Sequence, residues 1–164
     1  MRSLYAPWRM EYIGTPPDPG CLFCRVREAP PEDDRRNLVL HRAPDALVML
    51  NKFPYNPGHL MVAPRAHQSS LSALADDQVL AMMRLVQRSE QVLERVMSPE
   101  GFNVGVNLGR AAGAGIPDHV HLHMVPRWNG DTNFMPVLDE VKVVNEHLER
   151  TWEKLVAAFE DDEA

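Results

Sequence analysis

The chain has 164 residues, 45% of them hydrophobic and 24% charged, which fits one ordinary globular domain with a sizeable core. Its net charge of −6 argues against nucleic acid as a partner, and no apolar run is long enough to span a membrane. The N-terminus lacks a signal-peptide core, and the only cysteines form one Cys-x-x-Cys pair, which suits a reducing compartment. We therefore expect a cytoplasmic protein with a single domain over 1–164 and a frayed acidic tail at 160–164.

The first half of the chain predicts a loop-rich segment, three strands and a long helix. Residues 16–34 are rich in proline and charge, with a short helix expected after Cys24. Apolar runs at 37–41, 46–51 and 58–64 predict strands, the last two joined by a loop with prolines and a glycine. The helix begins with Asp76 as N-cap, and its apolar stripe consists of Val79, Met82, Met83, Val86, Leu93 and Met97.

The second half predicts two more strands and a final helix. Residues 102–107 alternate as in a strand, and a glycine-rich loop then leads into a strand with three alternating histidines at 119–125. Apolar residues at helical spacing place the final helix at about 139–159. This order of elements favours an α+β fold, an antiparallel meandering sheet covered by helices.

The alternating histidines are the main candidates for chemistry. A strand projects His119, His121 and His123 onto one face and sends the intervening Val120, Leu122 and Met124 into the core. An imidazole of this row could act as a nucleophile, the row could bind a catalytic metal, or the histidines could be structural. The preceding loop, residues 107–118, has glycines whose neighbouring N–H groups can approach a phosphate, which favours phosphate chemistry.

The row His119-Val120-His121-Leu122-His123-Met124-Val125 resembles the signature of the histidine triad (HIT) superfamily. Other elements follow in family order: Asn51 before Pro57-Gly58-His59, Asn107-x-Gly109, and Pro126-Arg127-Trp128. Residues 6–13 and 128–134 resemble a subgroup of dinucleoside polyphosphate hydrolases or phosphorylases.

This resemblance implies an enzyme with a HIT-like α+β fold, usually a homodimer, that transfers a nucleotidyl group. In that scheme His121 attacks the α-phosphorus of a diadenosine polyphosphate, and water or inorganic phosphate then releases the nucleotide. The same scheme gives His123 and His59 contacts to phosphate oxygens and gives Asn51 the ribose. It assigns the phosphates to Asn107 and to the backbone of Gly113, Ala114 and Gly115, and the base to apolar residues of 50–61.

One departure from the family leaves the acceptor and the leaving group open. Many relatives have a serine or glutamine shortly before the histidines, whereas residues 112–118 offer no such hydroxyl or amide. The rival functions are a purine nucleoside phosphoramidase, a metallohydrolase with all three histidines on a catalytic metal, and a nucleotide-binding module without catalysis.

The cysteine pair, Cys21 and Cys24, could be half of a zinc site, a redox pair or two spare thiols. In zinc-containing members of the superfamily, such a pair joins a histidine after the hairpin and the first histidine of the triad. The resemblance therefore implies zinc on Cys21, Cys24, His67 and His119. A site with four protein ligands and no open position would be structural.

Overall fold

The computed structural model describes residues 20–132 and 146–161. Its helices are α2 (Leu22–Glu28), α3 (Asp34–Asn37), α4 (Asp76–Met97) and α6 (Leu148–Asp161). Its strands are β1 (Val39–Arg42), β2 (Ala46–Leu50), β3 (Leu60–Pro64), β4 (Gly101–Val106) and β5 (Leu122–Arg127). Three 3-10 turns lie at Pro31–Asp33, Leu71–Ala73 and Arg110–Ala112. Parts of five segments discussed above lie outside the described residues: 6–13, 16–19, 133–134, 139–145 and 162–164.

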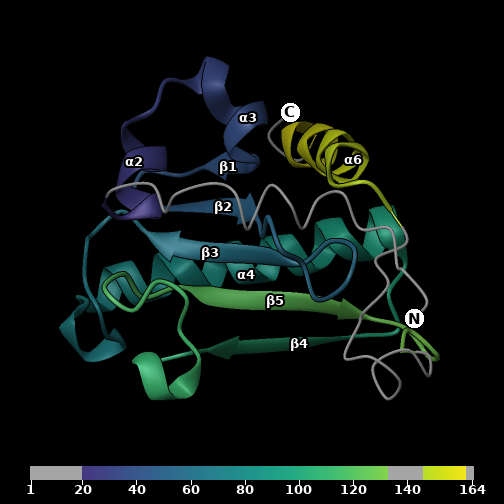
Figure 1. Cartoon of the computed structure of the whole chain (residues 1–164). Helices are drawn as coiled ribbons and strands as arrows, with labels where there is room; N and C mark the ends of the chain where they lie inside the picture. Colours follow the sequence, from purple (N-terminus) through teal and green to yellow (C-terminus); the bar gives the residue numbers. More distant parts are fainter. Residues whose placement is uncertain (1–19, 133–145, 162–164) are drawn as a thin grey trace, which may run out of the picture.

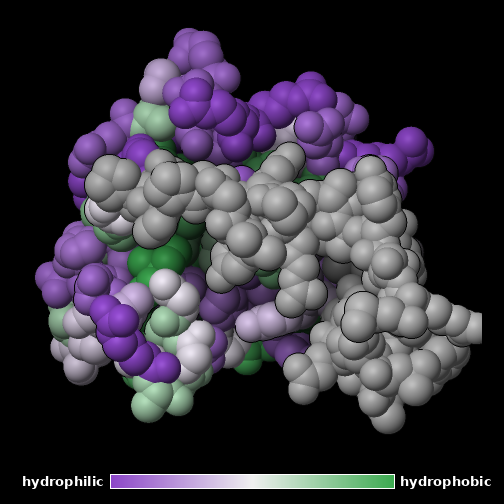
Figure 2. All heavy atoms as spheres, in the orientation of Figure 1, coloured by the Kyte–Doolittle hydropathy of each residue, from purple (hydrophilic) through white to green (hydrophobic). Residues whose placement is uncertain are grey.

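The five strands form one antiparallel sheet in the order β1-β2-β3-β5-β4. The predicted α+β class is therefore confirmed, together with the long helix and the C-terminal helix. Figure 1 shows α4 running behind β3 and β5, with α6 beyond the β1 edge. Hydrophilic side chains dominate the surface over α3 and α6 in the same orientation (Figure 2). None of the described helices is long and apolar enough to cross a membrane.

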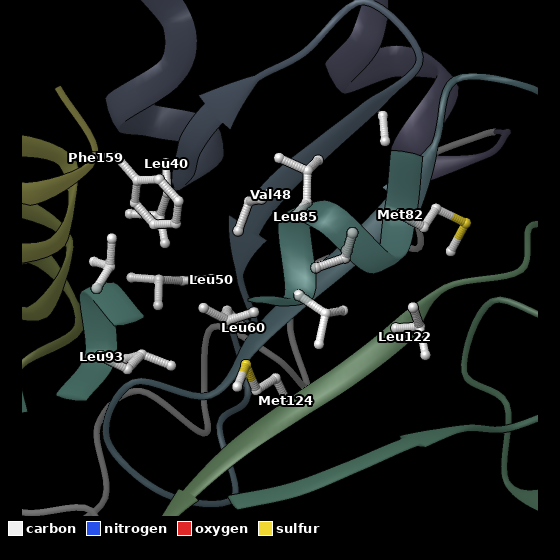
Figure 3. Close-up of a cluster of buried hydrophobic side chains, with 14 of the residues drawn as sticks. Leu40, Val48, Leu50, Leu60, Met82, Leu85, Leu93, Leu122, Met124 and Phe159 are labelled. Atoms are coloured by element: carbon white, nitrogen blue, oxygen red, sulfur yellow. The ribbon is translucent and has the colours of Figure 1, made fainter. Parts of the chain in front are cut away.

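The middle strands β2 and β3 are buried on both faces, because their side chains alternate between two hydrophobic clusters. The larger cluster lies between the sheet and the helices α4 and α6, and Figure 3 shows the side chains meeting there, including those of Leu50, Leu60, Leu93, Met124 and Phe159. The smaller cluster lies under α2 and consists of Phe23, Val26, Val39, Leu47, Met49, Met61 and Ala63. Val120, Leu122 and Met124 belong to the larger cluster, as the alternation predicts, so the histidines face the side of α2.

Several local expectations were wrong. Asp76 is the first helical residue rather than the N-cap, which is Ala75, and the Ala75 N–H donates to the side chain of Gln78. Met83 is 44% exposed and lies off the buried stripe of α4. The helix near the cysteines begins at Leu22, before Cys24. The histidine strand begins only at Leu122, because the Val120 N–H donates to the carbonyl of Gln68 outside the regular ladder.

Candidate active site and metal centre

Three histidines that lie in or next to two neighbouring strands meet on the α2 side of the sheet. His59 directly precedes β3, and the pairing of Met61 with His123 sets β3 beside β5. The ring centroids of His59 and His123 are 5.2 Å apart, and those of His121 and His123 are 4.7 Å apart. His59 and His121 are almost fully buried, whereas His123 is half-buried. The strand register thus brings together residues 64 positions apart in the sequence.

The hydrogen bond of His121 defines its tautomer. Its Nδ1 lies 2.9 Å from the carbonyl oxygen of His119, and a carbonyl can only accept, so Nδ1 carries the proton. The Nε2 atom of the neutral ring then holds the lone pair. Burial lowers the pKa of His121, which favours this neutral form, and the ring of Phe23 packs 4.9 Å from it. A neutral imidazole with one nitrogen fixed and the other holding a lone pair is suited to nucleophilic attack.

A second chain of hydrogen bonds fixes the tautomer of His123. The backbone N–H of Tyr55 donates to Nδ1 of His59 at 3.1 Å, so the proton of neutral His59 is on Nε2. That Nε2 lies 3.1 Å from Nδ1 of His123 and donates to it, which leaves the proton of His123 on its own Nε2. Burial, with a smaller contribution from His121, lowers the pKa of His123 to about 4. The neutral His123 ring therefore offers an N–H donor.

The loop that carries Tyr55 is anchored at its buried end. The Asn56 side chain is 2% exposed, and its amide donates to the Pro126 carbonyl at 2.9 Å and to Asp131 at 2.7 Å. Arg127 donates to both carboxylate oxygens of Asp131 and holds the pKa of that carboxyl well below its usual range. We call Asn56, Asp131 and Arg127 the loop anchor. It ties the β2–β3 loop to the end of β5.

The remaining residues predicted to contact the nucleotide lie in segments that follow β2 and β4, and the Asn51 N–H donates to the His59 carbonyl. Asn51 follows β2, and its side-chain oxygen accepts the Phe53 N–H at 2.9 Å. Asn107 is half-buried and follows β4, whose last residue, Val106, pairs with Leu122, the residue between His121 and His123. The glycine-rich loop starts from that point; Gly113 has a positive φ of 83°, and Gly113 and Gly115 are exposed while Ala114 is half-buried.

Four further residues form a compact cluster of metal-ligand types beside the histidines. Cys21 and Cys24 are free cysteines at the start of α2, His67 follows β3, and His119 precedes β5. Their potential ligand atoms all lie within 4.8 Å of one another. The Cys21 Sγ is 3.2 Å from His119 Nδ1, and the Cys24 Sγ is 3.2 Å from His67 Nδ1. In the part of the chain that the structure describes, the three alternating histidines do not form such a group.

The donor set and the tautomer of His119 fit a zinc ion. The Nε2 of His119 donates to the Pro64 carbonyl at 2.9 Å, which leaves the lone pair on Nδ1, the atom that faces the cysteines. Tetrahedral zinc with ligand bonds of about 2.0–2.3 Å separates its donor atoms by roughly 3.5 Å, close to the separations seen here. Burial beside Cys21 raises the pKa of the Cys24 thiol, so a bound cation would have to stabilise the thiolate.

Sequence reasoning missed several residues that build the site. Phe23, between the two cysteines, contacts the rings of both His119 and His121. The Tyr55 amide and the Asn56 backbone carbonyl bind His59, and the Asn56 side chain anchors the loop that carries them. An apolar residue inside a Cys-x-x-Cys is a usable signal for Phe23. The tyrosine acts through its backbone, which has no sequence signal.

Comparisons with known proteins agree with this geometry. The HIT domain matches residues 33–130. An AP-4-A phosphorylase from Mycobacterium tuberculosis is 38% identical over 157 residues, which are 92% of this chain and 80% of that protein. An adenosine 5'-monophosphoramidase from Schizosaccharomyces pombe is 29% identical over 66% of this chain and 75% of its own length.

A solved structure shares the fold. The zinc-bound histidine triad family protein from Mycobacterium smegmatis superposes with a TM-score of 0.68 at 26% identity, covering 88% of this chain and 96% of that one. The family match covers more than half of the chain and agrees with the row of alternating histidines. The chain therefore belongs to the histidine triad (HIT) family.

Proposed function

We propose that the chain is an enzyme that splits a dinucleoside polyphosphate, of the diadenosine tetraphosphate type, through a nucleotidyl group carried on His121. The observation that carries the proposal is the tautomer of His121, whose Nδ1 is bound to the His119 carbonyl and whose Nε2 holds a lone pair. The 38% identity to an AP-4-A phosphorylase supports the substrate class.

In the first step, His121 Nε2 forms a bond to the α-phosphorus, and the bond from that phosphorus to the bridging oxygen breaks. With diadenosine tetraphosphate, AMP stays on His121 and ATP leaves. His123 donates its Nε2–H to the phosphate oxygens that gain charge. Both ring nitrogens of His59 are engaged with protein atoms, so His59 acts through His123 rather than on the phosphate itself.

In the second step, an acceptor oxygen attacks the nucleotidyl phosphorus and the bond to His121 breaks. We propose inorganic phosphate as the acceptor, which yields ADP, because the M. tuberculosis relative is a phosphorylase. Asn51 holds the ribose, and Asn107 with the backbone at 113–115 holds the phosphates. In-line displacement requires mainly positioning and charge stabilisation, which these donors can supply.

The test is to incubate the protein with diadenosine tetraphosphate with and without inorganic phosphate and to separate the products. ATP and ADP formed only with added phosphate would support the phosphorylase, whereas AMP formed without phosphate would identify water as the acceptor. Rapid alkaline quenching followed by peptide mapping at alkaline pH should locate the adduct on His121, because the phosphorus–nitrogen bond is labile in acid. Binding without turnover or adduct would identify a nucleotide-binding module, and a preference for an adenosine phosphoramidate would identify a phosphoramidase.

We further propose a structural zinc ion on Cys21, Cys24, His67 and His119. It would fasten α2 to the ends of β3 and β5, and hold His119 where its backbone carbonyl accepts from His121. The zinc-bound relative of the same fold supports the metal. Four protein ligands leave no open coordination position, so the metal would not take part in the reaction.

The oligomeric state, the domain organisation and the cellular location are also proposals. A homodimer is supported by the exposed apolar residues Leu80, Met83 and Val104, because they lie on α4 and on the edge strand β4. Light scattering after size-exclusion chromatography would measure the mass.

A single domain over 1–164 is supported by the two hydrophobic clusters, which share one sheet, and a single unfolding transition would test it. The two free thiols support a cytoplasmic setting.

A further inference from the structure

Tyr55 is an exposed aromatic ring that stacks on a buried histidine of the site. Its ring lies nearly parallel to that of His59, with an interplanar angle of 18° and centroids 4.9 Å apart. The Tyr55 side chain is nevertheless 58% exposed, whereas His59 is fully buried. One face of the tyrosine thus covers His59, and much of the ring remains accessible to a ligand.

This accessible ring adjoins the reacting centre through a short series of rings. His59 donates to His123 at 3.1 Å, and the ring of His123 meets that of His121 at a centroid distance of 4.7 Å. Each separation between neighbouring ring centroids in this series is between 4.7 and 5.2 Å. A nucleoside would lie over Tyr55 if the bridging phosphates of a bound dinucleoside polyphosphate ran from His121 along this series of rings.

The backbone that carries Tyr55 is held in place in the absence of a ligand, and the stack on His59 orders one face of the ring. The Tyr55 N–H donates to His59 Nδ1, and the side chain of the next residue, Asn56, donates to the Pro126 carbonyl and to Asp131 within the loop anchor. The Asn56 carbonyl also accepts the His59 N–H at 3.1 Å, which closes the turn. A ring that is already ordered loses little conformational entropy when it binds a flat ligand.

We propose that Tyr55 is the stacking platform for the base of the departing nucleoside, the half of the dinucleoside polyphosphate that His121 does not retain. The proposal rests on the proposed function and adds a second base subsite to it. Stacking uses the face of a base, so the platform accepts any purine and adds affinity without reading hydrogen-bond groups. Substrates with two nucleosides are thereby favoured over nucleotides with one.

Adenosine 5'-tetraphosphate provides the matched comparison for diadenosine tetraphosphate, because it has the same reacting nucleotide and phosphate chain but lacks the second nucleoside. The natural protein should have a KM for the dinucleotide about 5- to 100-fold lower than for the mononucleotide, the range expected for one stacked base. Replacing the second adenosine by guanosine should change this ratio by less than about threefold.

Tyr55→Ala should abolish the preference for the dinucleotide, and Tyr55→Leu should do the same while keeping apolar bulk over His59. Tyr55→Phe and Tyr55→Trp should retain it, because both keep an aromatic ring. Binding of both compounds measured by calorimetry in the His121→Asn background should show the same pattern in the absence of turnover. Urea unfolding of each variant verifies that it is folded.

The proposal would be overturned if Tyr55→Ala and Tyr55→Leu raised the KM equally for diadenosine tetraphosphate and adenosine 5'-tetraphosphate. Tyr55 would then only cover His59. Equal KM values for the two substrates in the natural protein would overturn it as well. Failure of the proposed function looks different, because the natural protein would then cleave neither compound and form no adduct on His121.

Discussion

His59 Nε2 lies 3.1 Å from His123 Nδ1, and this contact determines which nitrogen of His123 carries the proton. His59 receives its own orientation from the Tyr55 N–H. A backbone amide of the β2–β3 loop thus decides, through one intermediate ring, that His123 has an Nε2–H donor available for a phosphate. Histidine positions fixed by outer hydrogen bonds of this kind are sensitive to the loss of the outer partner.

Replacing His59 by phenylalanine should lower kcat by about 10- to 100-fold, the usual cost of losing an orienting partner. Phenylalanine keeps an aromatic ring under Tyr55 but cannot donate to His123. The proton of His123 should then distribute between both nitrogens, which long-range ¹⁵N–¹H NMR spectra of the ring can measure. His147→Gln is the control, because His147 is exposed and precedes α6. An unchanged tautomer of His123 in the His59 variant would contradict this account.

The loop anchor should contribute measurably to stability and to the position of His59. Asn56→Ala removes two hydrogen bonds from a buried amide and leaves the Pro126 carbonyl without this donor, a loss of about 1–3 kcal/mol in the free energy of unfolding. Urea unfolding measures this loss. Hydrogen exchange of the Tyr55 amide should accelerate more than that of amides in α4. Equal acceleration everywhere would show that Asn56 supports only global stability.

The sequence predicted the elements because their physical cause is local. The two-residue alternation of 119–125 placed Val120, Leu122 and Met124 in the core opposite the histidines, and the structure confirms this. The start of a helix near residue 76 was also predicted correctly, but the predicted N-cap was wrong. The side chain of Gln78, not that of Asp76, accepts the N–H of Ala75 at the start of the helix. Cap choice depends on side-chain geometry that the order of residues does not determine.

The site could be predicted only in part, because its chemistry depends on contacts between distant residues. The alternation identified the three histidines of 119–123, and the resemblance added His59 and the set of four metal-ligand candidates. The structure brings those four within 4.8 Å of one another. The tautomers of His121 and His123 follow from a carbonyl at 119 and an amide at 55, neither of which is a side chain. The roles of Asn51, Asn107 and residues 113–115 remain predictions.

Removal of the nucleophile should abolish turnover while leaving the fold intact. His121→Asn should lower kcat by at least about 10³-fold, as for other covalent nucleophiles, and no adduct should form. Nucleotide binding should persist, because Asn51 and the loop before β5 are unchanged. Product formation is measured by chromatography, with His147→Gln as the control. An adduct mapped to His123 instead would show that the nucleophile has been assigned to the wrong ring.

Metal content should depend on the four clustered residues. The purified protein should hold about one zinc ion per chain, and His67→Ala or Cys24→Ser should lower zinc affinity by at least tenfold. Chelation should lower the melting temperature, since the metal links α2 to the sheet. Elemental analysis and thermal unfolding provide the measurements. Full turnover by folded, zinc-free protein would exclude a catalytic metal, whereas zinc bound normally by the His67 variant would contradict the ligand set.

Acid should destabilise the protein through His123. Burial, and to a lesser degree His121, lowers the pKa of His123 to about 4 in the folded state, against about 6.5 in the unfolded chain. Between these values the unfolded state binds a proton that the folded state does not, so the free energy of unfolding falls as pH decreases from about 6.5 to about 4. The contribution of neutral His123 to the free energy of unfolding is fully present above about pH 6.5.

His123→Gln removes this contribution while His59 and His121, the rings that face it, remain in place. Urea unfolding at about pH 7 and about pH 5 should show a loss of stability on acidification that is about 1–2 kcal/mol smaller in the variant, less than the full linkage value because His123 is half-buried. All samples contain the same zinc concentration, so the metal ligands contribute equally to the pH dependence of stability in the natural protein and in the variant. Identical losses in both proteins would mean that His123 is already protonated in the fold at pH 5.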